Sequence, residues 1–138
     1  HANADRTLPA ADECVNRVVS LFGRRPVQEI GRVLCPEGVC IVAVPAEEDL
    51  IELREQVQQA GHRRSRWEAV AEEMTAAGLE LTEHQSWKHR VELDRDAIDD
   101  ALAMTYRAGR NSERRRLEDV TSMSVTLAAD LLYLDRRH

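Results

Sequence analysis

The chain has 138 residues, of which 43% are hydrophobic and 32% are charged, a balance that is typical of a folded domain and excludes a disordered polymer. Its formal net charge of −6 argues against a protein that coats nucleic acid without sequence preference, although a local basic patch on an acidic body can still bind RNA. No apolar run approaches the roughly 20 residues of a membrane span, so we expect no membrane association.

Two apolar runs in the first third of the chain predict adjacent parallel strands. Residues 15–22 and 39–44 are too apolar for a sheet with one solvated face, which is typical of parallel strands that helices cover on both faces. A Pro-Glu-Gly turn at residues 36–38 is predicted just before the second run. Between the runs, one helical stripe is formed by Val27, Ile30, Val33 and Leu34. We therefore expect a right-handed βαβ crossover.

Two helices are predicted next. The first covers residues 46–60 and has an acidic first turn, which suits the positive end of a helix dipole. The second covers residues 66–77. It begins with Ser65 and Glu68 in the arrangement of a capping box and stops at Gly78.

The last part of the chain predicts two long strands around a short helix. Residues 79–93 and 120–133 alternate apolar and polar side chains, which favours half-exposed strands paired antiparallel at a sheet edge. Residues 95–106 repeat at helical spacing. His84 and His89 fall on opposite faces of the first of these strands, so they cannot both face one metal or catalytic centre. Its inward face is predicted to carry Leu79, Leu81, Trp87, Val91 and Leu93.

The three cysteines, Cys14, Cys35 and Cys40, are too few for a secreted disulfide scaffold. Cys35 and Cys40 bracket the predicted turn, but this neighbourhood offers too few further ligands for a metal, so we expect no metal site. Buried or turn thiols in a reducing cytosol are the expectation, which indicates a cytoplasmic protein.

Three sequence motifs in the first third of the chain resemble a known enzyme class. They are L-P-x-x-D at residues 8–12, V-x-S-x-F at 18–22 and E-x-x-R-V-L-x-P-x-G-V-x-I-V-x-V-P at 29–45. In this order they resemble the middle of a class I S-adenosylmethionine-dependent methyltransferase, from the loop after its third strand through its fifth. The resemblance implies an α/β fold with a partial Rossmann-like methyltransferase sheet, in which a parallel βαβ unit is followed by an antiparallel strand pair.

A glycine-rich cofactor turn does not occur in the sequence. The methyltransferases that the chain resembles bind the cofactor first at such a turn, after their first strand. The six glycines here are scattered and form no G-x-G run. We therefore interpret residues 1–138 as the C-terminal half of a methyltransferase domain that lacks its N-terminal, glycine-rich cofactor half. We expect the isolated chain to be inactive.

Three further motifs resemble the 23S ribosomal RNA guanine-N1 methyltransferase family. A-N-A-D-R before L-P, at residues 2–9, resembles its cofactor loop. P-x4-L-x2-L-R, at 45–54, is similar to its proline–helix junction, and L-x-M-T followed by two arginines, at 102–110, is similar to its substrate-side segment. The chain departs from the family pattern at Asp49, where the family usually has histidine, and at Tyr106, where it has proline.

The family resemblance implies N-methylation of a guanine in ribosomal RNA, with S-adenosyl-L-methionine as the cofactor. It places Asn3 and Ala4 at the adenine-binding position. Ser20, Leu21 and Phe22 lie at the carboxyl end of a predicted strand, where open α/β sheets present ligands. An ordinary polar turn and plain strand-end packing are the alternatives for these two groups. No catalytic residue is identified.

Basic residues are the candidate contacts to the substrate. Arg24 and Arg25 directly follow the first predicted strand and suit a phosphate or a base. A second set suits RNA phosphates and consists of His62, Arg63, Arg64, Arg107 and Arg110. All of these residues equally suit solvated surface charges.

Two other functions remain open. The acidic balance of the chain would suit a methyltransferase that acts on a small molecule. A non-catalytic module is the second alternative, because a half-sheet with a bare edge can pair with another chain. We therefore expect the partner to be ribosomal RNA for the parent protein, and either the missing N-terminal half or a second copy for this chain.

Overall fold

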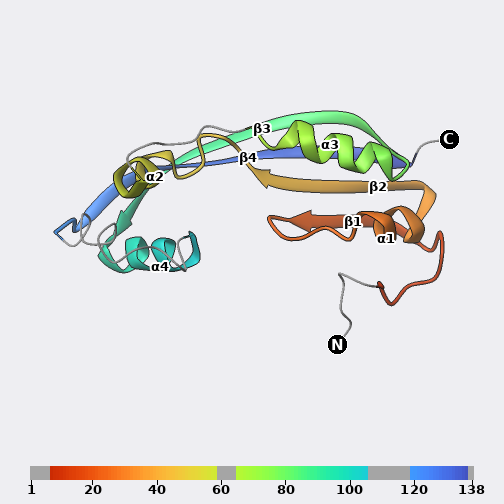
Figure 1. Ribbon diagram of the computed structural model, residues 1–138, viewed down its shortest axis with the longest axis horizontal. Helices are drawn as coiled ribbons and strands as arrows, with labels where there is room; N and C mark the ends of the chain where they lie inside the picture. Colours follow the sequence, from red (N-terminus) through yellow and green to blue (C-terminus); the bar gives the residue numbers. More distant parts are fainter. Residues whose placement is uncertain (1–6, 59–64, 106–118, 137–138) are drawn as a thin grey trace. The chain divides into compact units, whose positions relative to one another are not determined.

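The computed structural model describes residues 7–58, 65–105 and 119–136 (Figure 1). The elements of these residues, in chain order, are β1 (Val15–Leu21), α1 (Val27–Val33), β2 (Leu34–Pro45), α2 (Ile51–Gln58), α3 (Trp67–Ala76), β3 (Leu79–Asp94), α4 (Arg95–Thr105) and β4 (Ser122–Arg136). The described strands form one sheet in the order β1-β2-β4-β3, with β1 at one edge. The fold is α/β, as the sequence predicts.

The parallel pairing of β1 with β2 confirms the predicted βαβ unit. Val18 lies opposite Cys40, and Leu21 lies opposite Ala43, while α1 connects the two strands. On its other side β2 pairs antiparallel with β4, and β3 continues the sheet antiparallel to β4. The described sheet is therefore mixed, with its one parallel pair at the β1 edge.

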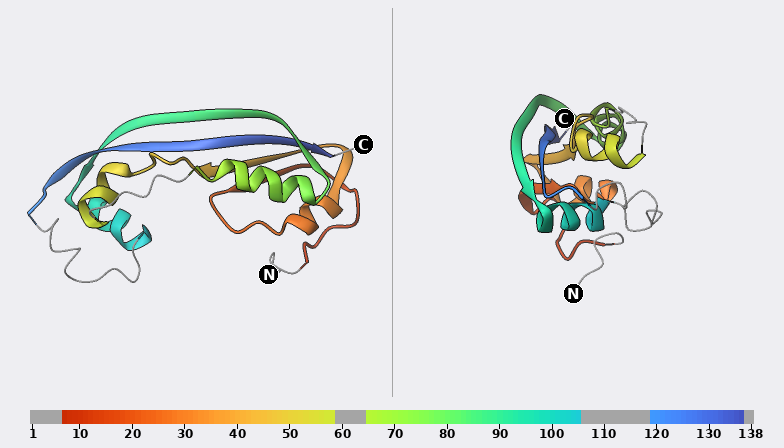
Figure 2. Two further views of the ribbon diagram at one scale, coloured as in Figure 1. Left: turned by 45° about the horizontal axis from the view of Figure 1, so that its top comes forward. Right: turned by 90° about the vertical axis from the view of Figure 1, so that its left-hand side faces the viewer.

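The chain divides into two compact units. The first contains β1, α1, β2 and α3, with residues 79–87 of β3 and 129–136 of β4. Helices α1 and α3 lie on one side of the sheet (Figure 2). Cys40, Val42 and Val44 alternate along β2, so they point to one face, and they share a core cluster with residues of these two helices. Burial raises the pKa of the Cys40 thiol to about 11, because a buried thiolate loses its hydration. Cys40 is therefore a neutral core residue, whereas Cys14 is exposed.

No helix of the described residues covers the opposite face of β1, which corrects the prediction that helices cover both faces. Val19 and Leu21 are 57% and 63% exposed. Among the described residues, α1 and α3 pack against the Cys40 side of the sheet, where a Cβ on Gly31 would lie 2.9 Å from the carbonyl oxygen of Ala77. The apolar content of β1 therefore predicted a parallel strand correctly, but it did not predict which of its faces the helices cover.

The predicted Pro-Glu-Gly turn lies inside β2 rather than before it. Between Val15 and Arg17 of β1, the paired residue on β2 advances from Leu34 to Val39. The additional residues of β2 bulge out of the ladder, and Gly38 is needed there because a Cβ would lie only 2.5 Å from a side-chain carbon of Leu34. The sequence therefore indicated the turn residues, but it did not predict that they lie within a bulged strand.

A small polar cluster anchors α3 to the sheet. The buried carboxylate of Asp130 lies 2.8 Å from Nε2 of His84 and accepts a hydrogen bond from Ser86 at 3.3 Å. The His84 ring stacks on Trp67, the first residue of α3, with 4.0 Å between the ring centroids. His84 is thus structural, which agrees with its separation from His89.

The predicted capping box is wrong, because Ser65 bonds the Glu68 side chain and no side chain caps α3.

The second unit contains α2 and α4 with the remaining parts of β3 and β4. Its core is formed by Leu53 of α2 together with Ile98 and Ala101 of α4. Helix α2 begins at Ile51 and not at residue 46. Leu50 has a positive φ of 51°, and its N–H donates to the carbonyl of Thr126 on β4. The backbone therefore follows β4 before the helix begins.

Two carboxylates also bind the start of α2 and the residues before it to β4. Asp49 accepts a hydrogen bond from the N–H of Ala128 at 2.8 Å, so the residue that departs from the family pattern acts as a backbone anchor. Glu52 accepts from the N–H of Thr126 at 2.9 Å and from its hydroxyl at 2.6 Å. Burial acts to raise the pKa of Glu52, but the bonds from Thr126 and the nearby Arg90 outweigh it and hold this pKa below its ordinary value of 4.5.

Substituting Glu52→Gln should therefore lower stability in a pH-dependent way. Because the pKa of Glu52 is lower in the folded state, the carboxylate stabilises the fold above the unfolded pKa near 4.5, and this contribution disappears as pH falls through the folded pKa. Urea unfolding at pH 7 should show a loss of about 1 kcal/mol, the net value of a hydrogen bond. The control is Glu55→Gln, an exposed residue of the same helix. An equal loss at pH 3 and pH 7 would contradict this role.

Candidate functional site

The carboxyl end of β1 leaves the sheet through an unusual backbone conformation. Phe22, the residue after the strand, has a φ of 55°, in the left-handed region that favours glycine. Its N–H still donates to the carbonyl of Ala43 at 3.0 Å, so pairing with β2 holds the chain up to the turn. The Phe22 side chain is 60% exposed. A bulky aromatic residue is therefore held in a strained backbone position without being needed for the core.

A cleft of about 290 Å³ lies beside this strand end. Its walls are Leu8 from the segment before β1, residues 18–21 of β1, and Ile30 of α1. Gly23, Arg24 and Pro26 complete the lining. Most residues that line the cleft are apolar, and Ser20 and Arg24 are the polar ones among those described. Small-molecule sites usually measure roughly 300–1,000 Å³, so this cleft suits one part of a larger ligand.

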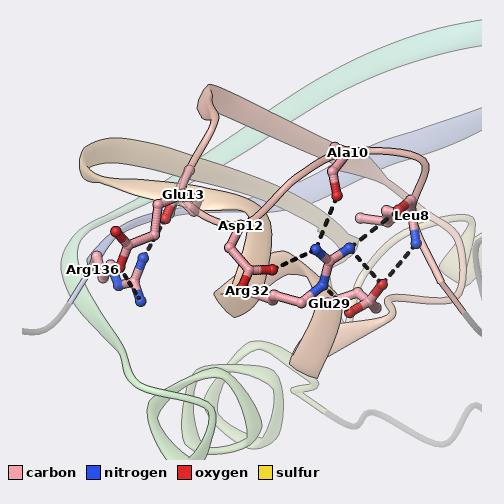
Figure 3. Close-up of polar contacts among 8 residues, drawn as sticks. Leu8, Ala10, Asp12, Glu13, Glu29, Arg32 and Arg136 are labelled. Atoms are coloured by element: carbon pink, nitrogen blue, oxygen red, sulfur yellow. Dashed lines mark hydrogen bonds and ion pairs between the residues drawn. The ribbon is translucent and has the colours of Figure 1, made fainter.

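The segment before β1 is fastened to α1 by one guanidinium (Figure 3). Arg32 of α1 donates to the carbonyl oxygens of Leu8 at 3.1 Å and Ala10 at 2.9 Å, and pairs with Asp12 at 2.7 Å. Glu29 lies 2.6 Å from Nε of Arg32 and accepts the N–H of Leu8 at 2.8 Å. The hydrogen bond with Arg32, and then that from Leu8, lower the pKa of Glu29, so the pair stays charged near neutral pH.

The structure brings some of the predicted site residues together. Ser20, Leu21 and Arg24 line the cleft, whereas Phe22 is not among its lining residues. Arg25 is half-buried and donates to the carbonyl of Gly23 at 3.3 Å, and its buried Nε has no hydrogen-bond partner. The other predicted residues lie outside the described part of the chain, namely Asn3, Ala4, His62, Arg63, Arg64, Arg107 and Arg110.

Sequence reasoning missed three residues that shape the cleft. Leu8 and Ile30 form two walls, and Arg32 holds the first of these walls in place. The available signal was the three-residue spacing of Glu29 and Arg32, which puts them on one helix face.

In residues 7–58, 65–105 and 119–136, no group of three or more His, Cys, Asp or Glu side chains could hold a metal ion. No helix in these ranges is long and apolar enough to cross a membrane.

Comparison by sequence identifies one informative relative. No family model matches the chain. The chain is 29% identical over 124 residues to a protein of Micromonospora griseorubida that is provisionally named a 23S rRNA (guanine-N1) methyltransferase. The match covers 88% of this chain but 42% of that protein, so the chain spans less than half the length of this curated relative.

Comparison with solved structures extends the likeness to the fold. A provisionally named methyltransferase from Bacillus halodurans C-125 matches with a TM-score of 0.63 at 16% identity, over 99% of this chain and 70% of that one. The 4+2 cyclase SpnF matches with a TM-score of 0.56 at 17% identity, over 99% of this chain and 55% of the cyclase. Identities this low show the fold alone, and one fold can host different reactions.

These findings confirm the resemblance that the motifs indicated. The described mixed sheet, with its parallel pair followed by antiparallel strands, matches the fold of the methyltransferase neighbours. The chain is similar in sequence to a 23S rRNA (guanine-N1) methyltransferase, and it has the fold of the class I methyltransferases.

Proposed function

We propose that this chain forms the second half of an S-adenosylmethionine-dependent methyltransferase domain that N-methylates a guanine of ribosomal RNA. The observation that carries the proposal is the cleft at the carboxyl end of β1, because ligands of open α/β sheets bind outside the carboxyl ends of the strands. The methyltransferase fold and the named activity of the relative support it.

The lining of the cleft fits part of the cofactor. Leu21 and the other apolar walls suit a flat or aliphatic group, and the Ser20 hydroxyl can donate or accept one hydrogen bond. We assign Ser20, Leu21 and Phe22 to this cofactor, together with Asn3 and Ala4 from the segment before Leu8. When bound, the cofactor supplies a methyl group on a sulfonium. The chain contributes by orienting the reactants and excluding water from the apolar cleft.

A strained, exposed Phe22 is expected of a functional site. Non-glycine residues in sparsely populated backbone regions cost about 1–3 kcal/mol and cluster at ligand sites. Phe22 lies in the chain between Leu21 and Gly23, which both line the cleft. Its strain is not compensated by burial of the ring, which is 60% exposed. Binding a ligand or another segment of the domain supplies the missing compensation.

The bare edge of β1 is where we place the remainder of the domain. Strand β1 ends the described sheet, and its face carrying Val19 and Leu21 is exposed. Unpaired strand edges accept further strands, and large exposed apolar patches mark contacts. The curated relative is more than twice as long as the matched region. We therefore propose that a glycine-rich half pairs along β1, with self-association as the alternative when that half is absent.

We assign contacts to RNA to Arg24 and Arg25 at the strand end and to the basic residues His62, Arg63, Arg64, Arg107 and Arg110. A cytoplasmic location suits the free thiols of Cys14, Cys35 and Cys40.

A small-molecule methyltransferase is the second candidate, because the fold is shared with a cyclase whose name indicates another chemistry, and because the net charge is negative.

Cofactor titration tests this proposal. Because the cleft suits only part of S-adenosylmethionine, calorimetry of the isolated chain should give a dissociation constant no tighter than about 1 mM, the weak end of the affinity scale. Adding the amino-terminal segment of the longer relative should bring binding into the micromolar range. Ser20→Phe, which fills the cleft, should abolish this gain, whereas Ser122→Phe, at an exposed position of β4, should not.

Three results would contradict the proposal. Micromolar binding by the isolated chain would refute the incomplete site, and no binding by the combination would refute the cofactor. With binding established, mass spectrometry should detect N1-methylguanine in a 23S rRNA transcript. Methylation of a small molecule but not of the transcript would favour the second candidate.

Replacing Phe22 tests its proposed strain. Phe22→Gly should raise the stability of the isolated chain by about 1 kcal/mol, because glycine adopts a positive φ without steric cost. The same substitution should weaken cofactor binding by the combined halves. Val19→Gly, at an exposed position within β1, is the control and should lower stability by roughly 0.5–1 kcal/mol. Loss of stability in both variants, as measured by urea unfolding, would show that Phe22 is not strained.

A further inference from the structure

The guanidinium of Arg32 uses its full set of donors on residues 8–12 and on Glu29 of its own helix. Nε binds Glu29, Nη1 binds Ala10 and Asp12, and Nη2 binds Leu8 and Glu29. These are five contacts for the five N–H groups of an arginine. Hydrogen bonds with Glu29 and Asp12 raise the pKa of Arg32, so its charge is permanent.

The partners of Arg32 differ in what they contribute. Asp12 is 76% exposed, and an ion pair with such a carboxylate is weakened by solvent and salt. Glu29 is more buried and bridges the system, because the carboxylate that binds Arg32 also accepts the N–H of Leu8. Both backbone polar groups of Leu8 are therefore bound to this one pair of side chains.

Among the described residues that line the cleft, Leu8 alone comes from the segment before β1, and the others belong to residues 18–30. Strand pairing and the helix itself hold β1 and α1 in place, whereas Leu8 lies outside both. We propose that Arg32 is a positioning residue of the cofactor cleft, which holds Leu8 at the distance from Ile30 that the ligand requires. The inference rests on the proposed function in taking this cleft as the binding site.

A lysine should not replace this arginine. Its ammonium is a compact point charge on a flexible stem, whereas the planar guanidinium reaches carbonyl oxygens and a carboxylate in fixed directions. Arg32→Lys keeps the charge and the attraction to Glu29, but it cannot hold Leu8, Ala10 and Asp12 together. The variant therefore separates a positioning role from a purely electrostatic one.

Arg136 of β4 offers a matched control, because it binds the same segment before β1. It pairs with Glu13 at 3.1 Å (Figure 3). It also donates to the carbonyl of Leu34 at 2.6 Å. Its side chain is 28% exposed and that of Arg32 is 30% exposed, so the two environments are comparable. Arg136 contacts no residue that lines the cleft through these bonds, so Arg136→Lys should loosen the segment without moving the Leu8 wall.

Amide hydrogen exchange of the isolated chain tests the proposal without any ligand. In Arg32→Lys the Leu8 amide should exchange about tenfold faster or more, as expected when hydrogen bonds to a charged group are lost. The amide shifts of Ser20 and Leu21 should move, while the urea midpoint changes little. In Arg136→Lys, Leu8 exchange and these shifts should stay as in the unmodified chain. Glu29→Gln is the second variant, and it should also speed Leu8 exchange.

Unchanged Leu8 exchange in both Arg32→Lys and Glu29→Gln would overturn the proposal. If Arg136→Lys speeds Leu8 exchange as much as Arg32→Lys does, Arg32 has only a general structural role and the proposal is overturned. The same follows if Arg32→Lys lowers global stability in proportion to the faster exchange. In the combined halves, Arg32→Lys should raise KM for S-adenosylmethionine several-fold and leave kcat nearly unchanged; an unchanged KM is the third contrary result. If unmodified halves bind no cofactor, the proposed function fails, and the exchange experiment still decides what Arg32 does.

Discussion

The packing of β2 in the middle of the described sheet is the constraint on which the first unit depends. Cys40, Val42 and Val44 are almost fully buried, and β2 is paired on both edges, parallel to β1 and antiparallel to β4. A parallel partner requires a crossover, and α1 supplies it while burying Val27 and Ile30 on the same core. This arrangement fixes where β1 ends, and so where a ligand can meet the sheet.

The candidate site follows from what this core leaves incomplete. Among the described residues, helices cover only one face of strand β1. The strand is followed by the strained Phe22 and borders a cleft whose Leu8 wall is held by Arg32. Each feature costs stability or depends on contacts outside the core. Their concentration at one strand end is what a binding site assembled from two halves would show.

Much of this fold could be predicted from the sequence, because it depends on local periodicity. The apolar runs of β1 and β2, the stripe of α1 and the stop of α3 before Gly78 all follow from nearest-neighbour chemistry. The bulge in β2, the late start of α2 and the bare face of β1 depend on partners far along the chain. Within the site, Ser20 belongs to a motif, and Arg24 was named because it follows a predicted strand. Arg32 holding Leu8 joins residues 24 positions apart, and no local pattern predicts that contact.

The central claim is that the outer edge of β1 is an unfinished surface that another segment of a methyltransferase sheet completes. Light scattering of the isolated chain over a concentration series tests it most directly. The account predicts a mass that rises above 15.7 kDa as concentration increases, because exposed strand edges with apolar side chains recruit other chains. A mass that stays at 15.7 kDa at all concentrations would contradict it, and would show that these residues close their own core.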